Sequence, residues 1–398
     1  MSESNQRKNK IILLLLSISA FFASLNQNIY SPMIPLIRDT FETTIFWVNL
    51  TVSGFIFITA IMQVILGTFI DTKNQKKLLV FSLILTSISI LFCAFTTNFV
   101  VFFIARMFQA IGTAMIPLIA VNVIAILFEG EERGDAMGTY QILLTLAPAL
   151  APILGGFIGQ YYGYSGVFLF LFIISMILLI FLGYQLPTLN GQQTVDDRKE
   201  RHMYQRYKIL WSNKKGMNVI GVGFLTFLIY FSILTYLPVL LHDHYQVSLQ
   251  IIGLLYLPLT VSMILGSVLF KKLQRKFDLE KLYHVTLFLM PILIILFGII
   301  LEKNIIILSI VLFIYGVLLG FSSPLFSTMI SNQYTNERGL ALGLFNFVRY
   351  CGMAIGAGIV GVNFLNSTSL FIVLGILFLA FSLVLNQNQN VKIKEGSE

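Results

Sequence analysis

Long apolar runs recur along the whole chain and are separated by short polar stretches. Each run contains about 20 residues or more, the length that an α-helix needs to cross the hydrocarbon core of a bilayer. We therefore predict an all-α membrane protein. Its twelve spanning helices are expected at residues 11–36, 45–66, 77–96, 99–127, 136–160, 165–186, 217–241, 250–270, 282–301, 304–331, 339–362 and 367–386. Several are longer than a bilayer requires, so we expect them to be tilted.

One segment of the first half of the chain returns in the second half. The sequence ERGDAMG at 132–138 is matched by ERGLALG at 337–343, so equivalent positions differ by 205 residues. An offset of about half the chain length indicates an internal duplication. We predict two pseudo-symmetric six-helix halves, at 1–186 and 217–398, joined by a cytoplasmic linker at 187–216. Two such halves, related by an axis along the membrane normal, form a known transporter architecture with the substrate path at their interface.

The composition supports lipid as the solvent for much of the chain. Of its 398 residues, 57% are hydrophobic and 11% are charged, whereas soluble proteins carry about 25% charged residues. The two cysteines, Cys93 and Cys351, fall in different predicted spans, far apart in sequence. We expect neither a disulfide nor a metal site from them.

The positive charge is concentrated in the loops on one side of the predicted spans. With the N-terminus in the cytoplasm, 22 of the 26 Lys and Arg residues lie in cytoplasmic segments, and only Arg38 and Lys303 lie in external loops. This distribution follows the positive-inside rule and predicts a multi-pass protein of the cell (plasma) membrane with both termini cytoplasmic. Topology and contact with anionic lipid account for the net charge of +8, so we expect no nucleic-acid partner.

Two segments place small and charged residues where helices meet or turn. The first, GTFIDTKNQKK, begins at Gly67 and carries the carboxylate of Asp71 ahead of the cation of Lys76. Ion pairs and helix-end contacts of this kind can lock or release one face of a transporter. The second, RMFQAIGTA, places the charged Arg106 and the amide of Gln109 inside a predicted span.

A third segment, APALAPILGG, combines helix-interrupting and small residues. It contains Pro148 and Pro152, followed by Gly155 and Gly156. Proline removes a helical hydrogen bond, and glycine lets another backbone approach closely. The segment therefore predicts a bend and a close helix contact, which are features that alternating access uses.

In this order and at these helix positions, the three segments resemble those of the major facilitator superfamily, and more narrowly the twelve-helix drug:proton antiporters. The fourth predicted helix fits the family pattern at Arg106, Gln109 and Gly112. The fifth fits at its proline and paired glycines. The inner-loop segment departs from the family at Thr72, where Arg is usual, and at Asn74, where Gly is usual.

The first predicted helix adds a further resemblance and a further departure. It contains NIYSPMIP, which is similar to the Asp-x-Tyr-x-Pro pattern of bacterial drug-resistance members, with Asn28 in place of Asp and with Tyr30 retained. The resemblance implies the major facilitator fold, alternating access and exchange of substrate against protons. It also implies a role for Arg106 in proton movement.

Charged residues inside the predicted spans are restricted to arginine. No Asp or Glu lies well inside a span, whereas Arg106 and Arg349 both do. A charge at such a depth is costly unless it faces a partner or a wet cavity, so both are functional candidates. For Arg106 the alternatives are substrate or proton coupling and a structural bond to Gln109 and to carbonyls of the first helix. For Arg349 they are substrate contact and structural pairing.

The other candidates have packing alternatives as well. Amide side chains can join helices by hydrogen bonds, and tyrosine can pack against neighbours. The further candidates for substrate contact or coupling are Asn26, Asn28, Tyr30, Gln141 and Asn346. In the repeated segments, Arg133 and Arg338 are candidates for gating or for plain helix-end contacts. The sequence HDH at 242–244 could hold a metal, but we expect a solvated turn.

The chain has no phosphate-binding GxxxxGK[ST] loop and no large soluble domain, which argues against an ATP-driven pump and against an enzyme. We predict a secondary transporter that exports amphipathic drugs, and so contributes to antibiotic resistance, in exchange for protons. The alternative is export of an anionic metabolite such as a carboxylate siderophore, because arginine pairs well with carboxylates. A transporter-like sensor that moves no solute is a third possibility. The expected partners are a small-molecule substrate and the bilayer, with a monomer as the functional form and neither metal nor cofactor.

Overall fold

The computed structural model describes residues 3–69, 73–187, 208, 210–335, 337–362 and 366–395. These residues form helices and connecting turns, with no strand among them, so the predicted all-α fold class is confirmed. Within the described ranges, eleven helical segments are long and apolar enough to cross a membrane. In chain order the elements are α1 (Glu3–Asn28), η1 (Ser31–Met33), α2 (Ile34–Thr40), α3 (Ile45–Phe69), α4 (Gln75–Phe95), α5 (Phe99–Leu127), α6 (Gly130–Gln185), α8 (Lys214–Val239), η3 (Leu240–His244), α9 (Leu249–Leu273), α10 (Leu279–Ile300), α11 (Ile305–Gln333), α12 (Arg338–Ile359) and α13 (Ser367–Glu395).

The first predicted span is interrupted. A single helix was expected at 11–36, but α1 ends at Asn28, and the short helices η1 and α2 follow. Pro32 and Pro35 lie in the first turn of these short helices. Proline lacks a backbone N–H and fits the first turn of a helix but not its interior, so each proline starts a new helix.

The fifth and sixth predicted spans follow one another in α6 (Gly130–Gln185), which comprises two helices that meet at a kink. The kink lies at Gly163, inside the break predicted at 161–164. Gly163 has φ 66° and ψ −175°, a conformation that only glycine adopts at little cost. One residue therefore separates two helical segments that are each long enough to span a bilayer, which accounts for eleven segments where twelve were predicted.

The chain divides into two compact units, which are described separately. Unit 1 comprises residues 1–196 and 234–256, and unit 2 comprises 197–233 and 257–398. The end of α8, all of η3 and the start of α9 therefore belong to unit 1. Most of the predicted linker at 187–216 lies outside the described residues. The division into halves at 1–186 and 217–398 stays a prediction.

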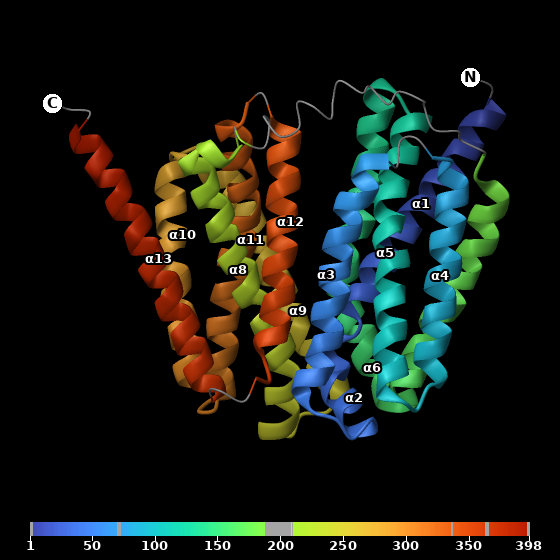
Figure 1. The fold of residues 1–398 in the computed structure, drawn as a ribbon, viewed down its shortest axis with the longest axis horizontal. Helices are drawn as coiled ribbons and strands as arrows, with labels where there is room; N and C mark the ends of the chain where they lie inside the picture. Colours follow the sequence, from blue (N-terminus) through green and yellow to red (C-terminus); the bar gives the residue numbers. More distant parts are fainter. Residues whose placement is uncertain are drawn as a thin grey trace. The chain divides into compact units, whose positions relative to one another are not determined.

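In unit 1, α1 packs against α5 and α6, and α4 packs against the same two helices (Figure 1). The helix α3 also packs on α5. Gly112 permits the close approach of α5 to α4, because a Cβ there would lie 2.7 Å from the Ser82 carbonyl oxygen. The start of α9 joins the unit through a hydrogen bond of 3.1 Å from the backbone N–H of Leu249 to the side chain of Gln160.

In unit 2, α10 packs against α11 and α13, and α11 packs against α12. Gly352 allows α12 to lie against α8, since a Cβ there would be 2.5 Å from the Phe224 carbonyl oxygen. At one end of the unit, the Tyr334 hydroxyl donates to the Leu210 carbonyl at 2.8 Å. Burial raises the pKa of the Tyr334 phenol, which keeps this donor protonated.

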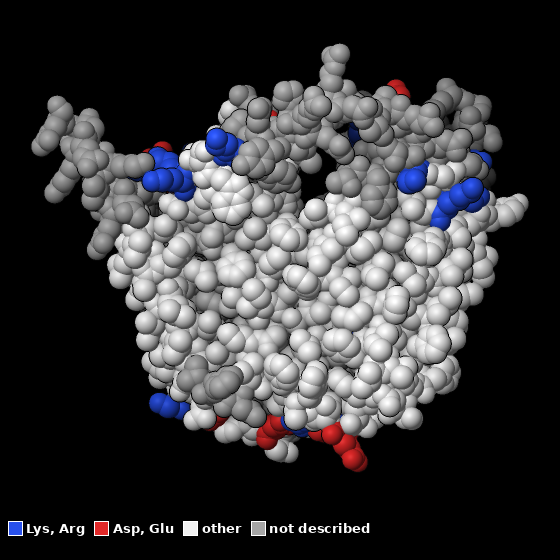
Figure 2. All heavy atoms as spheres, viewed as in Figure 1, with Lys and Arg blue, Asp and Glu red and all other residues white. Residues whose placement is uncertain are grey.

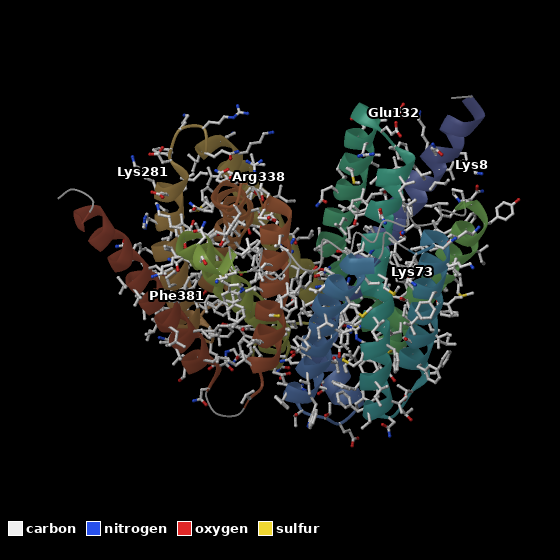
Figure 3. The ribbon with its side chains drawn as sticks, turned by 45° about the horizontal axis from the view of Figure 1, so that its top comes forward. Lys8, Lys73, Glu132, Lys281, Arg338 and Phe381 are labelled. Carbon is white, nitrogen blue, oxygen red and sulfur yellow. The ribbon has the colours of Figure 1, made fainter. Side chains whose placement is uncertain are left out.

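Charged side chains on the visible surface lie at the helix ends (Figure 2). In Figure 2 the visible Lys, Arg, Asp and Glu residues lie at the two ends, and the surface between them is uncharged. In Figure 3, Lys281 and Arg338 lie at one end of unit 2, and Lys8 and Glu132 lie at one end of unit 1. A wide uncharged belt is what a protein with lipid around its middle requires.

Candidate functional site

The buried side chain of Arg106 is the centre of a polar network in unit 1. It lies two turns into α5, and its guanidinium NH1 donates to Gln109 Oε1 at 2.9 Å. Gln109 Nε2 donates in turn to Asn26 Oδ1 of α1 at 2.6 Å. Asn26 Nδ2 donates to the Phe22 carbonyl of its own helix at 3.0 Å. The structure thus brings together three of the predicted candidates and links α5 to α1.

Aromatic rings surround the rest of the Arg106 guanidinium. Its central carbon lies 4.6 Å from the ring centroid of Tyr30, 4.4 Å from that of Phe55 and 5.9 Å from that of Phe168. Arg106 is 1% exposed. Cations are attracted to aromatic faces, and more strongly when desolvated. This enclosure stabilises a charge that would otherwise be too costly at this depth.

Within the described part of the chain, no carboxylate pairs with Arg106, and its Nε has no hydrogen-bond partner. The described Asp and Glu residues lie near helix ends or in the turns between helices. An uncompensated cation favours nearby anions and disfavours nearby cations and protons. The network can therefore respond to charge that enters or leaves its surroundings.

Two neighbouring candidates have different environments. The Tyr30 hydroxyl is hydrogen-bonded to Thr51 Oγ1 of α3 at 2.7 Å, so Tyr30 connects the Arg106 enclosure to a third helix. Asn28 is only partly buried, and its Nδ2 donates to the Ser24 carbonyl of α1 at 2.8 Å. Asn28 is thus held on its own helix rather than in the Arg106 network.

Arg349 lies in unit 2, halfway along α12. Its guanidinium carbon is 5.0 Å from the Phe227 ring centroid and 5.5 Å from the Tyr350 ring centroid. Among the described residues it makes no ion pair, and its buried Nε has no hydrogen-bond partner. Unlike Arg106, the residue is only partly buried. The predicted candidate Asn346, one turn earlier on α12, is exposed, as is Gln141 on α6 of unit 1.

The inner-loop candidates are only partly described. Gly67 lies near the end of α3, and Lys76 lies in the first turn of α4. Asp71 lies outside the described residues. Asn74 caps α4, and its side chain accepts from the Lys77 backbone N–H at 3.0 Å. The residue that replaces the family's glycine thus has a structural use as a helix cap.

The glycines of the third motif lie at close helix contacts. A Cβ on Gly155 would clash with the Ile29 carbonyl oxygen just after α1. A Cβ on Gly156 would lie 3.1 Å from the Cα of Gly253 in α9. Pro152 is buried at this contact, and Pro148 is exposed. Both interfaces belong to unit 1, and the gating role of these residues stays a prediction.

Arg133 and Arg338 make the same kind of contact in their respective units. Arg133 Nε donates to the Phe128 carbonyl at the end of α5, at 2.9 Å. Arg338 Nε donates to the Ser331 carbonyl in the last turn of α11, at 3.2 Å. A cation at a helix C-terminus satisfies free carbonyls and complements the helix dipole. Equivalent residues of the repeat therefore anchor successive helices in the same way.

An ion pair that sequence reasoning missed joins α2 to η3 in unit 1. Arg38 of α2 forms a bidentate pair with Asp243 of η3, one bond being 3.0 Å long. His242 Nδ1 lies 2.9 Å from the same carboxylate. No group of metal-binding side chains occurs among the described residues. The signal was present in the repeat, since Arg38 and Asp243 are opposite charges separated by 205 positions.

Comparisons with known proteins agree with this architecture. The sequence profile of the Major Facilitator Superfamily matches residues 16–357. Citrate exporter 1 of Aspergillus niger is 24% identical over 46% of this chain and 35% of its own length. MFS antiporter QDR3 of Candida albicans (strain SC5314 / ATCC MYA-2876) is 29% identical over 48% of this chain and 28% of its own length. The chain therefore spans about a third of the length of the curated relatives that it matches.

A solved structure extends the similarity to nearly the whole chain. The crystal structure of a D-xylose-proton symporter aligns with a TM-score of 0.74 at 17% identity. The alignment covers 93% of this chain and 96% of that one. At this identity the likeness shows a shared fold.

Proposed function

Since the chain belongs to the Major Facilitator Superfamily, we propose that it exports amphipathic small molecules by alternating access, in exchange for protons. The protein is a multi-pass membrane transporter and not an enzyme. What we propose beyond this is the direction of transport (export), the coupling ion (the proton) and the substrate class (amphipathic small molecules). Two relatives, citrate exporter 1 and MFS antiporter QDR3, are an exporter and an antiporter by name, which supports the direction and the exchange.

The observation that carries the proposal is the buried network of Arg106, Gln109 and Asn26. The network joins α5 to α1. A charge buried at this depth is energetically unfavourable. Among the described residues, Arg106 has no carboxylate partner. A movement of α1 relative to α5 would break the Gln109–Asn26 bond and change the energy of the Arg106 charge. Such coupling between helix position and the energy of a buried charge lets a binding event shift the conformational equilibrium, which supports alternating access.

The contacts of unit 1 support alternating access. Gly156 and Gly253 let α6 and α9 approach closely, and Arg38 pairs with Asp243 at the same end of the unit. Both contacts join the first part of the chain to 234–256, a segment of the predicted second half. Small-residue contacts and an exposed ion pair can form and break with little loss of packing.

We would test the proposal in inside-out membrane vesicles energised with a proton gradient. The probes are a matched naphthyl series: 2-naphthylacetate, 2-naphthylacetamide and 2-(2-naphthyl)ethylamine. We expect gradient-dependent accumulation of at least one probe, abolished by a protonophore. We expect Arg106→Ala to reduce it at least tenfold, and Arg106→Lys to retain a part because it keeps the charge but not the planar fork.

The control is Arg275→Ala, because Arg275 is an exposed arginine outside the network. This variant should accumulate the probes at the wild-type rate. Equal expression of all variants in the membrane separates loss of transport from loss of folding. Full accumulation by Arg106→Ala, or accumulation by wild type that ignores the protonophore, would contradict the proposal.

A further inference from the structure

The Arg349 side chain lies at the middle of α12. The helix runs from Arg338 to Ile359, so Arg349 is about 15 Å from either end at 1.5 Å per residue. In a membrane-spanning helix this is close to mid-depth, where a charge needs a partner.

The backbone that carries Arg349 is fixed against α8. One turn after Arg349, a Cβ on Gly352 would lie 2.5 Å from the Phe224 carbonyl oxygen. Further along, the Ser232 hydroxyl donates to the Gly356 carbonyl at 2.9 Å. These contacts define the face of α12 that packs on α8, and so the side of the helix on which Arg349 lies.

Aromatic side chains surround Arg349 within unit 2. Phe227 lies under its guanidinium, and the Phe227 and Tyr230 rings meet edge to face at 6.4 Å. Tyr315 lies on α11, the helix that packs against α12. Its buried hydroxyl has no hydrogen-bond partner in the described part of the chain. A free donor is therefore present on the helix next to the one that carries the unpaired cation.

Among the described side chains of unit 2, no carboxylate is placed to neutralise Arg349. The described carboxylates lie near helix ends: Asp278, Glu280, Glu302 and Glu337. Glu337, which directly precedes α12, is twelve positions before Arg349. This separation corresponds to about 18 Å along the helix.

The two embedded arginines differ in accessibility. Arg106 is enclosed by three rings and has an amide partner, whereas Arg349 is partly exposed and has only ring contacts. Arg106 is thus closed off from solutes by its neighbours, although its Nε also has no partner among the described residues. Arg349 is the one of the two that can accept a partner from outside the chain.

We propose that Arg349, with Phe227, Tyr230 and Tyr315, forms the binding site for the carboxylate of an amphipathic organic acid. The inference rests on the proposed function, because it names the substrate class of that transport. The guanidinium pairs with the carboxylate in bidentate fashion. The rings of Phe227 and Tyr230 contact the apolar body of the acid, and the Tyr315 hydroxyl donates to the carboxylate. Cationic amphipaths are disfavoured because no counter-charge is present.

The test is equilibrium binding of the naphthyl series to the full chain in lipid nanodiscs, with empty nanodiscs as the blank. Wild type should bind 2-naphthylacetate at least tenfold more tightly than 2-naphthylacetamide, and 2-(2-naphthyl)ethylamine most weakly. Arg349→Ala should reduce the preference for the carboxylate to below threefold. Arg349→Lys should retain part of it, and Tyr315→Phe, which keeps the ring, should weaken carboxylate binding about three- to tenfold.

The Arg275→Ala variant should bind like wild type, and thermal unfolding of each variant shows that it is folded. Absence of a carboxylate preference in wild type, or a preference unchanged in folded Arg349→Ala, would overturn the site. If 2-naphthylacetamide or 2-(2-naphthyl)ethylamine accumulates with the gradient and Arg349→Ala accumulates it equally, the proposed function stands. This result would overturn the carboxylate site. Arg349-dependent carboxylate binding without gradient-driven accumulation of any probe would support the site and contradict the proposed function.

Discussion

Each embedded arginine has its charge stabilised by neighbours of a different kind. Arg106 relies on an amide and three rings, and the amide in turn bonds Asn26. Arg349 relies on rings alone. A buried donor that loses its acceptor costs the full desolvation penalty. The Arg106 network is therefore sensitive to the loss of any one member.

Replacing Gln109 tests this sensitivity. Gln109→Met keeps the side-chain volume but removes the acceptor of Arg106 and the donor to Asn26. We expect the free energy of unfolding to fall by about 1–3 kcal/mol and probe accumulation to fall with it. Gln109→Glu keeps an acceptor for Arg106 and adds a counter-charge, so its thermal unfolding temperature should stay close to that of wild type. A wild-type unfolding temperature for Gln109→Met would show that the network contributes nothing to stability.

At the residue scale, the sequence named the members of the Arg106 network among its candidates but did not show which candidates lie outside it. The spacing of Arg106 and Gln109 at i and i+3 puts both on one helix face, so their bond was foreseeable. The structural alternative had Arg106 bonding Gln109 and carbonyls of the first helix. The structure shows the bond to Gln109, while the contact with the first helix is made by Gln109, which donates to the Asn26 side chain. The sequence could not show which of Asn26 and Asn28 contacts α5, because this depends on the rotation of α1 about its axis.

Among the elements, close contacts between helices depend on individual glycines. Gly112 packs α5 on α4, and Gly155 packs α6 on the end of α1. Gly134 and Gly138, at the start of α6, have no neighbouring atom within 4 Å of the position that a Cβ would occupy. Glycines of one chain therefore divide into those that permit packing and those that do not touch a neighbour.

Alanine substitution should separate these two classes of glycine. Gly112→Ala inserts a methyl group against the Ser82 carbonyl and Thr86, and we expect it to lower the free energy of unfolding by about 1–3 kcal/mol. Gly138→Ala is the matched control within a helix, and it should be neutral or stabilise by up to about 1 kcal/mol through helix propensity. Equal unfolding temperatures for the two variants would mean that α4 and α5 can make room for a methyl group at Gly112, contrary to the close contact seen there.

The helices themselves followed from the apolar pattern, because a span needs only length and hydrophobicity. The break after Asn28 was not predicted, because it depends on prolines in a segment that is as apolar as the helices around it. The kink at Gly163 falls in the break predicted at 161–164, but its form depends on the φ angle of one residue, which the apolar pattern does not give.

The duplicated plan of the chain appears in contacts at equivalent positions. Arg133 and Arg338 anchor the ends of α5 and α11 in the same way. Arg38 and Asp243, also 205 positions apart, instead pair with each other. Exposed ion pairs contribute about 0–1 kcal/mol to stability. We therefore expect the pair to affect the rate of the transport cycle more than the stability of the fold.

Removing and exchanging these charges tests that role. In Arg38→Ala or Asp243→Asn, we expect the unfolding temperature to change little, and the rate of probe accumulation to change about two- to fivefold. The charge-exchanged double variant, Arg38→Asp with Asp243→Arg, should recover much of the wild-type rate. High salt should shift wild type toward the single variants, since screening weakens exposed pairs. Rates that are unaffected in all variants would exclude the ion pair from the transport cycle.

The most direct test of the whole account is proton release driven by substrate. In sealed proteoliposomes with an internal proton load and a pH indicator, addition of 2-naphthylacetate should cause proton efflux together with probe uptake. Both fluxes should disappear in Arg106→Ala and persist in Arg275→Ala. Probe uptake without proton movement, or proton movement that does not depend on any probe of the series, would contradict exchange transport by this protein.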